Sequence, residues 1–319
     1  MAEEVWMLQT KKADFKQIGA RFRIDPVTAR IIRNRGIEGE AAIDRYLNGT
    51  LDDLYDPMLL KDMERAVSIL CEAVDTGKKI RIVGDYDIDG VCSTYILLQA
   101  FERLGSDVDF EIPDRIKDGY GINESIIEQA HADGVEVILT CDNGISAFHQ
   151  VELAKKYGMT VVITDHHEVP LDGEKEKIPP ADAVIDPKQA DCPYPFPEIC
   201  GAVVAYKLVQ VLYARRGVPQ MEWLDLLEFA AIATVGDVMK LQDENRILVK
   251  YGLKKMAQTK NLGLRRLAEK NNLDLGAITA YHIGFVIGPC LNAGGRLKTA
   301  KEALALLRAQ SEEEAERLA

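Results

Sequence analysis

The middle of the chain alternates short apolar stretches with longer segments of helical period. The short stretches are KIRIVG (79–84), VDFEIP (108–113), VEVILTC (135–141), MTVVIT (159–164) and AVI (183–185). Several of them are apolar with little alternation, which is typical of strands that are covered on both faces. The segments between them, 91–105, 123–134 and 146–158, carry apolar residues at helical spacing. We therefore predict an α/β fold in which a parallel β-sheet is flanked by helices.

The two flanks of this region read as mainly helical. A helix start is indicated by Pro26 after Asp25, and residues 63–77 and 201–217 keep the helical period. We expect a helical N-terminal segment (1–78) that packs on the α/β domain, the α/β domain itself (79–240), and a helical C-terminal segment (241–319). The last segment stops in helical register without a cap, so we expect it to lead toward a second domain that this chain lacks.

Composition fits a packed intracellular protein. Hydrophobic residues make up 47% of the 319 residues and charged residues 28%. No apolar run is long enough to span a membrane, and the acidic start lacks the apolar core of a signal peptide, so we expect a cytoplasmic protein without a membrane partner. The six cysteines form no CxxC pair and are expected to be reduced thiols.

The formal net charge of −12 argues against a broadly basic nucleic-acid-binding face. The count includes every carboxylate, however, and bound divalent cations reverse the local sign of an acidic site. The positions of the acidic residues therefore matter more than their total number.

Acidic residues and histidines follow the predicted strands, at the edge where open parallel sheets bind ligands. Along the chain these residues are Asp85, Asp87, Asp89, Asp142, Asp165, His166, His167 and Asp186, and Asp237 lies in a later apolar helical run. Carboxylate and imidazole ligands together suit Mn²⁺ better than Mg²⁺ or Ca²⁺. Two such ions, bridged by one carboxylate, can activate water for the hydrolysis of a phosphate ester.

Each of these residues also has an ordinary structural explanation. Asp-Gly and Asp-Asn-Gly are common turns, adjacent histidines are often surface or cap residues, and Asp237 after Gly236 fits a helix N-cap. The repetition of such groups at several strand ends on one sheet edge favours the metal site.

The order of three blocks, DYDIDG (85–90), CDNG (141–144) and TDHHE (164–168), resembles the DHH phosphoesterase superfamily. Within it, the chain is similar to the RecJ family of single-strand-specific exonucleases. Further matching blocks are PDRIKDGYG (113–121), ATVGDVM (233–239) and GPCLNAGGRL (288–297), so the resemblance covers nearly the whole chain. The second conserved domain and the oligonucleotide-binding barrel of that family are not visible here.

The resemblance implies a role for each matching residue. The implied ligands of two Mn²⁺ (or Mg²⁺) ions are Asp87, Asp89, Asp142, His166 and Asp237, with Asp142 bridging the ions. His167 would act beside the scissile phosphate, while Asp85 and Asp165 would support the ligands. Contacts to substrate phosphate and nucleic acid are implied for Arg115, Asn292 and Arg296. A wider basic strip would add Lys254, Lys255, Arg265 and Arg266, which equally fit a solvated helix face.

The function implied is 5′-to-3′ exonuclease activity on single-stranded DNA in recombination and repair. A single-strand-binding protein or a helicase would be a candidate partner besides the DNA. One alternative is a DHH phosphoesterase that acts on oligoribonucleotides, cyclic dinucleotides or inorganic polyphosphate. The other is a non-catalytic DHH-fold subunit that binds nucleic acid.

Overall fold

The computed structural model describes residues 11–114, 121–297 and 300–319, and its contacts divide the chain into residues 1–54 and residues 55–319. The described part of the first unit contains α1 (Phe15–Phe22), α2 (Pro26–Asn34), α3 (Glu40–Asn48) and the short 3₁₀ helix η1 (Leu51–Asp53). Asp14 and Asp25 cap the first two helices through their carboxylates. A small core of Ile32, Ile37, Ile43 and Tyr46 holds this unit together. The expected docking of residues 1–78 on the α/β domain stays a prediction.

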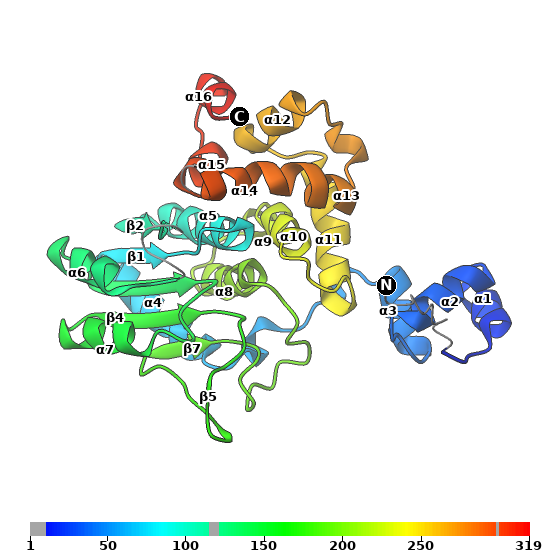
Figure 1. Ribbon diagram of the computed structural model, residues 1–319, viewed down its shortest axis with the longest axis horizontal. Coiled ribbons are helices and arrows are strands. Elements are labelled where there is room, and N and C mark those ends of the chain that lie inside the picture. Colours follow the sequence, from blue (N-terminus) through cyan, green and yellow to red (C-terminus); the bar gives the residue numbers. More distant parts are fainter. Residues whose placement is uncertain (1–10, 115–120, 298–299) are drawn as a thin grey trace, which may run out of the picture. The chain divides into compact units, whose positions relative to one another are not determined.

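The second unit is built on a parallel sheet, as predicted. Among the described residues its strands lie in the order β2–β1–β3–β4–β7 (Figure 1). The strands are β1 (Ile80–Val83), β2 (Val108–Glu111), β3 (Val137–Cys141), β4 (Thr160–Thr164) and β7 (Ala183–Ile185). Cys141 pairs with Thr164, and Thr164 pairs with Ile185, so these neighbouring strands end at one level.

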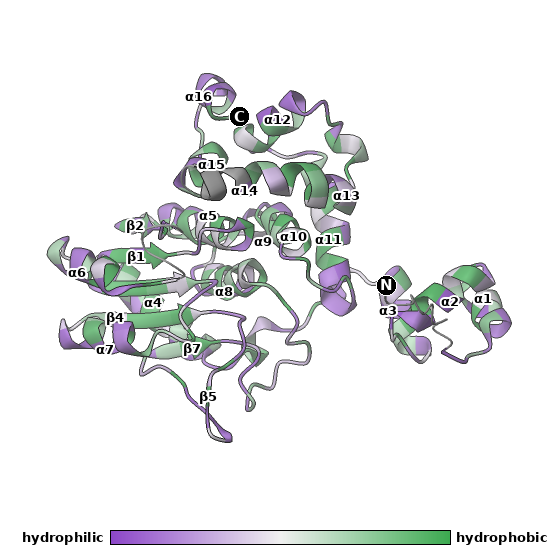
Figure 2. Ribbon diagram, viewed as in Figure 1, coloured by the Kyte–Doolittle hydropathy of each residue, from purple (hydrophilic) through white to green (hydrophobic). Residues whose placement is uncertain are grey.

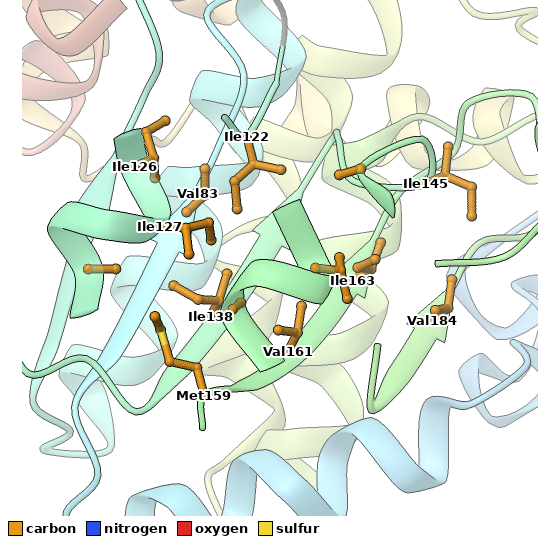
Figure 3. Packing of buried hydrophobic residues seen from close by; sticks show 14 of the residues in the cluster. Val83, Ile122, Ile126, Ile127, Ile138, Ile145, Met159, Val161, Ile163 and Val184 are labelled. Carbon is orange, nitrogen blue, oxygen red and sulfur yellow. The ribbon is translucent and has the colours of Figure 1, made fainter. Parts of the chain in front are cut away.

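Helices cover both faces of the sheet, which explains why the inner strands β3 and β4 are largely apolar, while the edge strand β2 carries Asp109 and Glu111 (Figure 2). On one face, α6 (Glu124–Ala132) and α7 (Phe148–Lys156) enclose a cluster that includes Ile127, Ile138 and Val161 (Figure 3). On the other face lie α4 (Met63–Asp75), α5 (Ile88–Arg103) and α8 (Gly201–Arg215), in contact with the strands. The short 3₁₀ helix η2 (Pro57–Leu59) packs on α4 and α8.

The rest of this unit is helical, as the sequence predicts. Its elements are α9 (Gln220–Leu224), α10 (Leu227–Gly236), α11 (Asp243–Met256), α12 (Leu262–Lys270), η3 (Leu275–Ala277), α13 (Ala280–His282), the π-helix η4 (Ile283–Ile287), α14 (Gly288–Leu297), α15 (Ala300–Leu307) and α16 (Glu312–Leu318). α10 packs against α5, α8 and α11, so it joins this helical part to the sheet.

Two local features differ from the expected pattern. α5 begins at Ile88 and not at Val91, because Asp87 caps it and draws Asp89 and Gly90 into its first turn. A small antiparallel hairpin, β5 (Leu171–Asp172) and β6 (Lys175–Glu176), follows β4 and was not predicted.

All six cysteines are free thiols, as expected. In the described ranges, no helix has both the length and the apolar character needed to cross a bilayer.

The contact between α10 and α11 gives a direct test of packing. A Cβ atom at Gly252 would lie 2.3 Å from the Cβ of Ala231 and 2.9 Å from the carbonyl oxygen of Leu227. We expect Gly252→Ala to force the two helices apart and to lower the free energy of unfolding by about 1–3 kcal/mol. At the helical control position, Gly284→Ala would meet only a Val235 methyl at 3.7 Å. Denaturant unfolding would contradict this packing if both variants matched the wild type.

Candidate metal centre

The strand order creates a crevice between the ends of β1 and β3. From β1 the chain goes to β2 on one side and then to β3, β4 and β7 on the other, so the strand order reverses between β1 and β3. Doubly wound sheets bind their ligands at such a reversal. The aspartates after β1 and the Asp142 segment after β3 meet there. The sequence prediction that acidic groups gather at this edge is therefore matched by the backbone.

Asp87 and Asp89 are fixed by helix N-termini. Asp87 caps α5, and its Oδ1 accepts hydrogen bonds from the backbone N–H groups of Asp89 (2.9 Å) and Gly90 (3.0 Å). The carboxylate of Asp89 accepts from the N–H groups of Gly201 (2.7 Å) and Ala202 (2.8 Å), which begin α8. Asp89 therefore joins α5 to α8, and these donors orient its oxygens as the partners of metal ligands commonly do.

Asp142 is held in an uncommon backbone conformation. Its φ of 61° lies in the left-handed region, which Asp tolerates better than most residues other than glycine. The start of α8 packs directly on it, because a Cβ atom at Gly201 would lie 2.7 Å from the Cβ of Asp142. Glycine at position 201 is thus required for the buried placement of Asp142.

Asp165 organises the turn that carries both histidines. Its Oδ2 accepts from the N–H of Ile145 (2.9 Å), and its Oδ1 accepts from the N–H groups of His166 (2.8 Å) and His167 (3.3 Å). The same Oδ1 lies 2.7 Å from Nδ1 of His167. Asp165 therefore holds the turn, and it fixes the ring of His167 through Nδ1.

Three groups of donor atoms, each within 4.8 Å of one another, meet in the crevice. The groups are Asp85, Asp87 and Asp142; Asp89, His166 and Asp237; and Asp142, His166 and His167. Asp142 belongs to two groups, and its Oδ1 lies 3.1 Å from Nε2 of His166. The same nitrogen is 3.4 Å from Oδ2 of Asp89 and 3.9 Å from Oδ2 of Asp237. The donors thus form one connected cluster with Asp142 and His166 in the middle.

Asp237 reaches the cluster from the helical part of the unit. It caps the C-terminus of α10, so the alternative interpretation as a helix N-cap is wrong. A carboxylate at a helix C-terminus faces the negative end of the helix dipole. Membership of the donor cluster therefore explains an aspartate at position 237 better than helix capping does.

Burial and mutual repulsion disfavour the charged forms of Asp85, Asp142 and Asp237. Burial and the Asp87 charge raise the pKa of Asp85 to about 7, and burial with Asp89 and Asp87 raises that of Asp237 to about 7. The pKa of Asp142 is raised well above its ordinary value, first by burial and then by Asp89 and Asp87. Oδ1 of Asp85 is buried without a hydrogen-bond partner in the described part of the chain. A cation among these oxygens would offset the repulsion.

The two histidines have opposite properties. Burial lowers the pKa of His166, which favours the neutral ring with a lone pair for a metal. Burial also opposes the charged form of His167, but the hydrogen bond and charge of Asp165 outweigh it and raise its pKa to about 9. A cavity of about 230 Å³ adjoins His167 and is lined in part by Gly121, Asn143 and Ile145. The arrangement combines a neutral imidazole, a cationic imidazole and a space beside the latter.

The remaining predicted residues lie outside this cluster or outside the described residues. Arg115 falls in the range that the structure does not describe, and Arg296 is placed only by its backbone, in α14. Asn292, also in α14, is half-buried. Asp186 is fully buried at the end of β7 and shares no donor group with the other acids in the described ranges.

Three of the four residues of the wider basic strip pair with acidic partners, while Lys254 lies over the ring of Tyr251. Lys255 pairs with Asp225, and both Arg265 (2.8 Å) and Arg266 (2.9 Å) pair with Glu312. This favours the solvated-face interpretation that the sequence left open.

Sequence reasoning missed two components of the site. One is the N-terminus of α8, whose position against Asp89 depends on a contact across 112 residues of sequence. The other is Lys188, which pairs with Glu168 at 2.8 Å. Its charge adds to the burial that lowers the pKa of His166, and it partly offsets the burial that raises the pKa of Asp237. Lys188 directly follows Asp186-Pro187, a position at the same sheet edge that could have drawn attention to it.

Comparison with known proteins gives a consistent picture. Residues 79–234 match the model of the DHH family, N-terminal domain. The single-stranded-DNA-specific exonuclease RecJ of Bacillus subtilis is 38% identical over 315 residues, which cover 98% of this chain and 39% of that protein. This chain therefore spans about two fifths of the length of that relative.

Solved structures agree with this match. RecJ of Thermus thermophilus in complex with Mn²⁺ superposes with a TM-score of 0.78 at 31% identity, covering 95% of this chain and 42% of that one. The same protein in complex with Mg²⁺ gives a TM-score of 0.67 at 30% identity, covering 95% of this chain and 39% of that one. Residues 79–234 of this chain therefore form a DHH-family domain, and the chain is similar to RecJ proteins over most of its length.

Proposed function

We propose that this chain is a metal-dependent phosphodiesterase that removes nucleotides from the 5′ ends of single-stranded DNA in the cytoplasm, in recombination and repair. The observation that carries the proposal is the connected donor cluster around Asp142 and His166, in which every group has at least two carboxylates or a carboxylate with imidazoles. The similarity to RecJ exonucleases supports the choice of substrate. The chain's partial coverage of those relatives leaves the activity to be tested on this chain.

The donor set fits two divalent cations, Mn²⁺ or Mg²⁺. Asp89, His166 and Asp237 would hold one ion, and Asp87 with Asp142 would hold the second, with Asp142 bridging them. Asp85 was expected only to support the ligands, but it shares a donor group with Asp87 and Asp142. The mixture of carboxylate and imidazole favours Mn²⁺ over Mg²⁺. Bound ions would supply Lewis acidity toward phosphoryl oxygens and a lowered pKa for water.

The chain's own residues would position the substrate and hold the proton. The hydrogen bond and charge of Asp165 favour the protonated form of His167, and Asp165 fixes the ring through Nδ1. Nε2 is then the atom that would donate to a phosphate oxygen, where it would stabilise the charge that develops during hydrolysis. Arg115, Asn292 and Arg296 stay predicted contacts to the strand, as does a single-strand-binding protein or helicase as a partner.

The metal assignment is tested by the ion dependence of thermal stability. We expect Mn²⁺ at 100 times its dissociation constant to stabilise the wild type by about 2.7 kcal/mol, which raises the melting temperature by several degrees. Asp142→Asn should lose this shift. Without metal it should melt no lower than the wild type, because it removes a carboxylate whose charged form is disfavoured by burial.

Asp186→Asn is the matched control for this test. Asp186 is as buried as Asp142, and burial with the Asp165 charge raises its pKa to about 7, yet it lies outside the donor groups. This variant should keep the full Mn²⁺ shift. An equal shift in both variants would show that the ions bind elsewhere.

The substrate assignment is tested with end-labelled strands. We expect the chain with Mn²⁺ to release mononucleotides from the 5′ end of a single-stranded oligodeoxynucleotide, faster than it cleaves a dinucleotide or the same sequence as a duplex. Product analysis with 5′ and 3′ labels measures the polarity. Cleavage of the dinucleotide alone would instead support a DHH phosphoesterase for small substrates, and release from the 3′ end would contradict the proposed direction.

A further inference from the structure

Three strongly exposed apolar side chains lie near the end of α10 that carries Asp237. Val238 is 87% exposed, Tyr281 64% and Phe285 70%. Scattered exposed apolar residues are ordinary, but two stacked aromatic rings on a segment that packs against α10 form a more specific surface. Val238 directly follows Asp237, and the two aromatic residues lie on the segment formed by α13 and η4.

The two rings form a small preformed stack. The centroids of Tyr281 and Phe285 are 4.8 Å apart, and the ring planes differ by 27°. The π-helix η4 anchors the pair, because Ile283 and Ile287 are buried at 0% and 1% exposure while Phe285 projects outward. π-helical turns are rare and frequently occur at functional sites. We name the pair of Tyr281 and Phe285 the aromatic platform.

The segment that carries the aromatic platform contacts both helix ends that bring acidic groups to the metal centre. A Cβ atom at Gly284 would touch Val235, two residues before Asp237, at 3.7 Å. A Cβ atom at Gly288 would lie 3.5 Å from Ile88, the residue between Asp87 and Asp89. Figure 1 shows α13 on the side toward which the sheet strands point. The segment then continues into α14, which contains Asn292 and Arg296.

The acidic balance of the chain favours a contribution to DNA affinity that does not depend on charge. The net charge is −12, and Lys255, Arg265 and Arg266 are already paired with carboxylates. These three paired residues therefore have less charge available for phosphate contacts. Stacking of bases on aromatic rings contributes affinity without charge, tolerates any base, and requires bases that are free of a partner strand.

We propose that the aromatic platform binds single-stranded DNA by stacking its unpaired bases, a few nucleotides from the scissile phosphate. This inference rests on the proposed function, and it adds the means by which that site would select single strands over duplexes. The segment that carries the platform contacts Val235 and Ile88, which lie next to candidate metal ligands. This argues that the platform binds the substrate strand. A second copy of the chain is the competing occupant that the experiment must separate.

The experiment measures binding separately from hydrolysis. Fluorescence anisotropy would follow a labelled 12-nucleotide single strand with the whole chain in Ca²⁺, which supplies divalent charge to carboxylates. We expect Phe285→Ala and Tyr281→Ala each to weaken binding by about five- to 100-fold. Phe285→Tyr should keep most of the affinity. The melting temperatures should stay at the wild-type value because both rings are largely exposed.

Strands with a three-nucleotide abasic window, moved along the sequence, identify the stacking contribution. For one window position, the wild type should bind as weakly as Phe285→Ala does, because the bases that stack are absent. The dependence of affinity on salt should be the same in the wild type and in Phe285→Ala, since no phosphate contact is removed. If Phe285→Ala weakens binding by the same factor for every window position, the ring does not stack on particular bases and the proposal is overturned.

Tyr157→Ala is the matched control. Tyr157 is also partly exposed and stacks on His131 with 4.2 Å between ring centroids. It precedes β4, however, and so lies at the N-terminal ends of the strands, away from the candidate metal centre. This variant should bind the strand like the wild type. Equal weakening by Tyr157→Ala would contradict a site-specific role for the aromatic platform.

Two further outcomes separate this proposal from the others. If the wild type binds single strands through the platform but hydrolyses none, the proposed function fails and the platform stands. If Phe285→Ala changes the oligomeric state in sedimentation and leaves DNA affinity unchanged, the rings form an interface between copies and the proposal is overturned.

Discussion

The architecture of this molecule depends on how the repulsion among buried carboxylates at one sheet edge is offset. Asp85, Asp89 and Asp142 are each at most 2% exposed, and burial raises the pKa values of Asp85 and Asp142. Unpaired charges in such a place are costly, and no arrangement of turns requires them. Helix N-termini supply part of the compensation, through the cap of Asp87 on α5 and the N–H groups of α8 on Asp89. Divalent cations would supply the rest.

Rigid elements set the geometry of the site. Two parallel strands bring the Asp87 and Asp142 segments together, α8 packs on both Asp89 and Asp142, and α10 carries Asp237 in from the helical part. Gly201 shows how tight this convergence is, because a single added carbon would collide with Asp142. The same two helix ends contact the neighbouring segment, α10 through η4 and α5 through the start of α14, next to the exposed aromatic rings. The candidate metal ligands and the proposed strand-binding surface therefore share one scaffold.

The sequence predicted the parts of this arrangement that depend on local pattern. The apolar runs that form β1, β3 and β4 marked the strands, and the acidic residues after them were correctly expected at one edge, because parallel strands end together. It did not predict the contact of α8 with Asp89, which joins residues 112 positions apart. It also missed the influence of Lys188 and the exposure of Tyr281 and Phe285, because exposure depends on which face of the π-helix is covered by neighbouring elements.

The most direct test of the central claim is the number and coupling of bound Mn²⁺ ions. Equilibrium dialysis would count the ions per chain, and electron paramagnetic resonance would report whether they are close enough to couple their spins. Two ions per chain with a spin-coupled signal are expected if Asp142 bridges them. Uncoupled ions, or a chain that takes up no Mn²⁺ while remaining folded, would show that the carboxylate cluster is not a dinuclear metal centre.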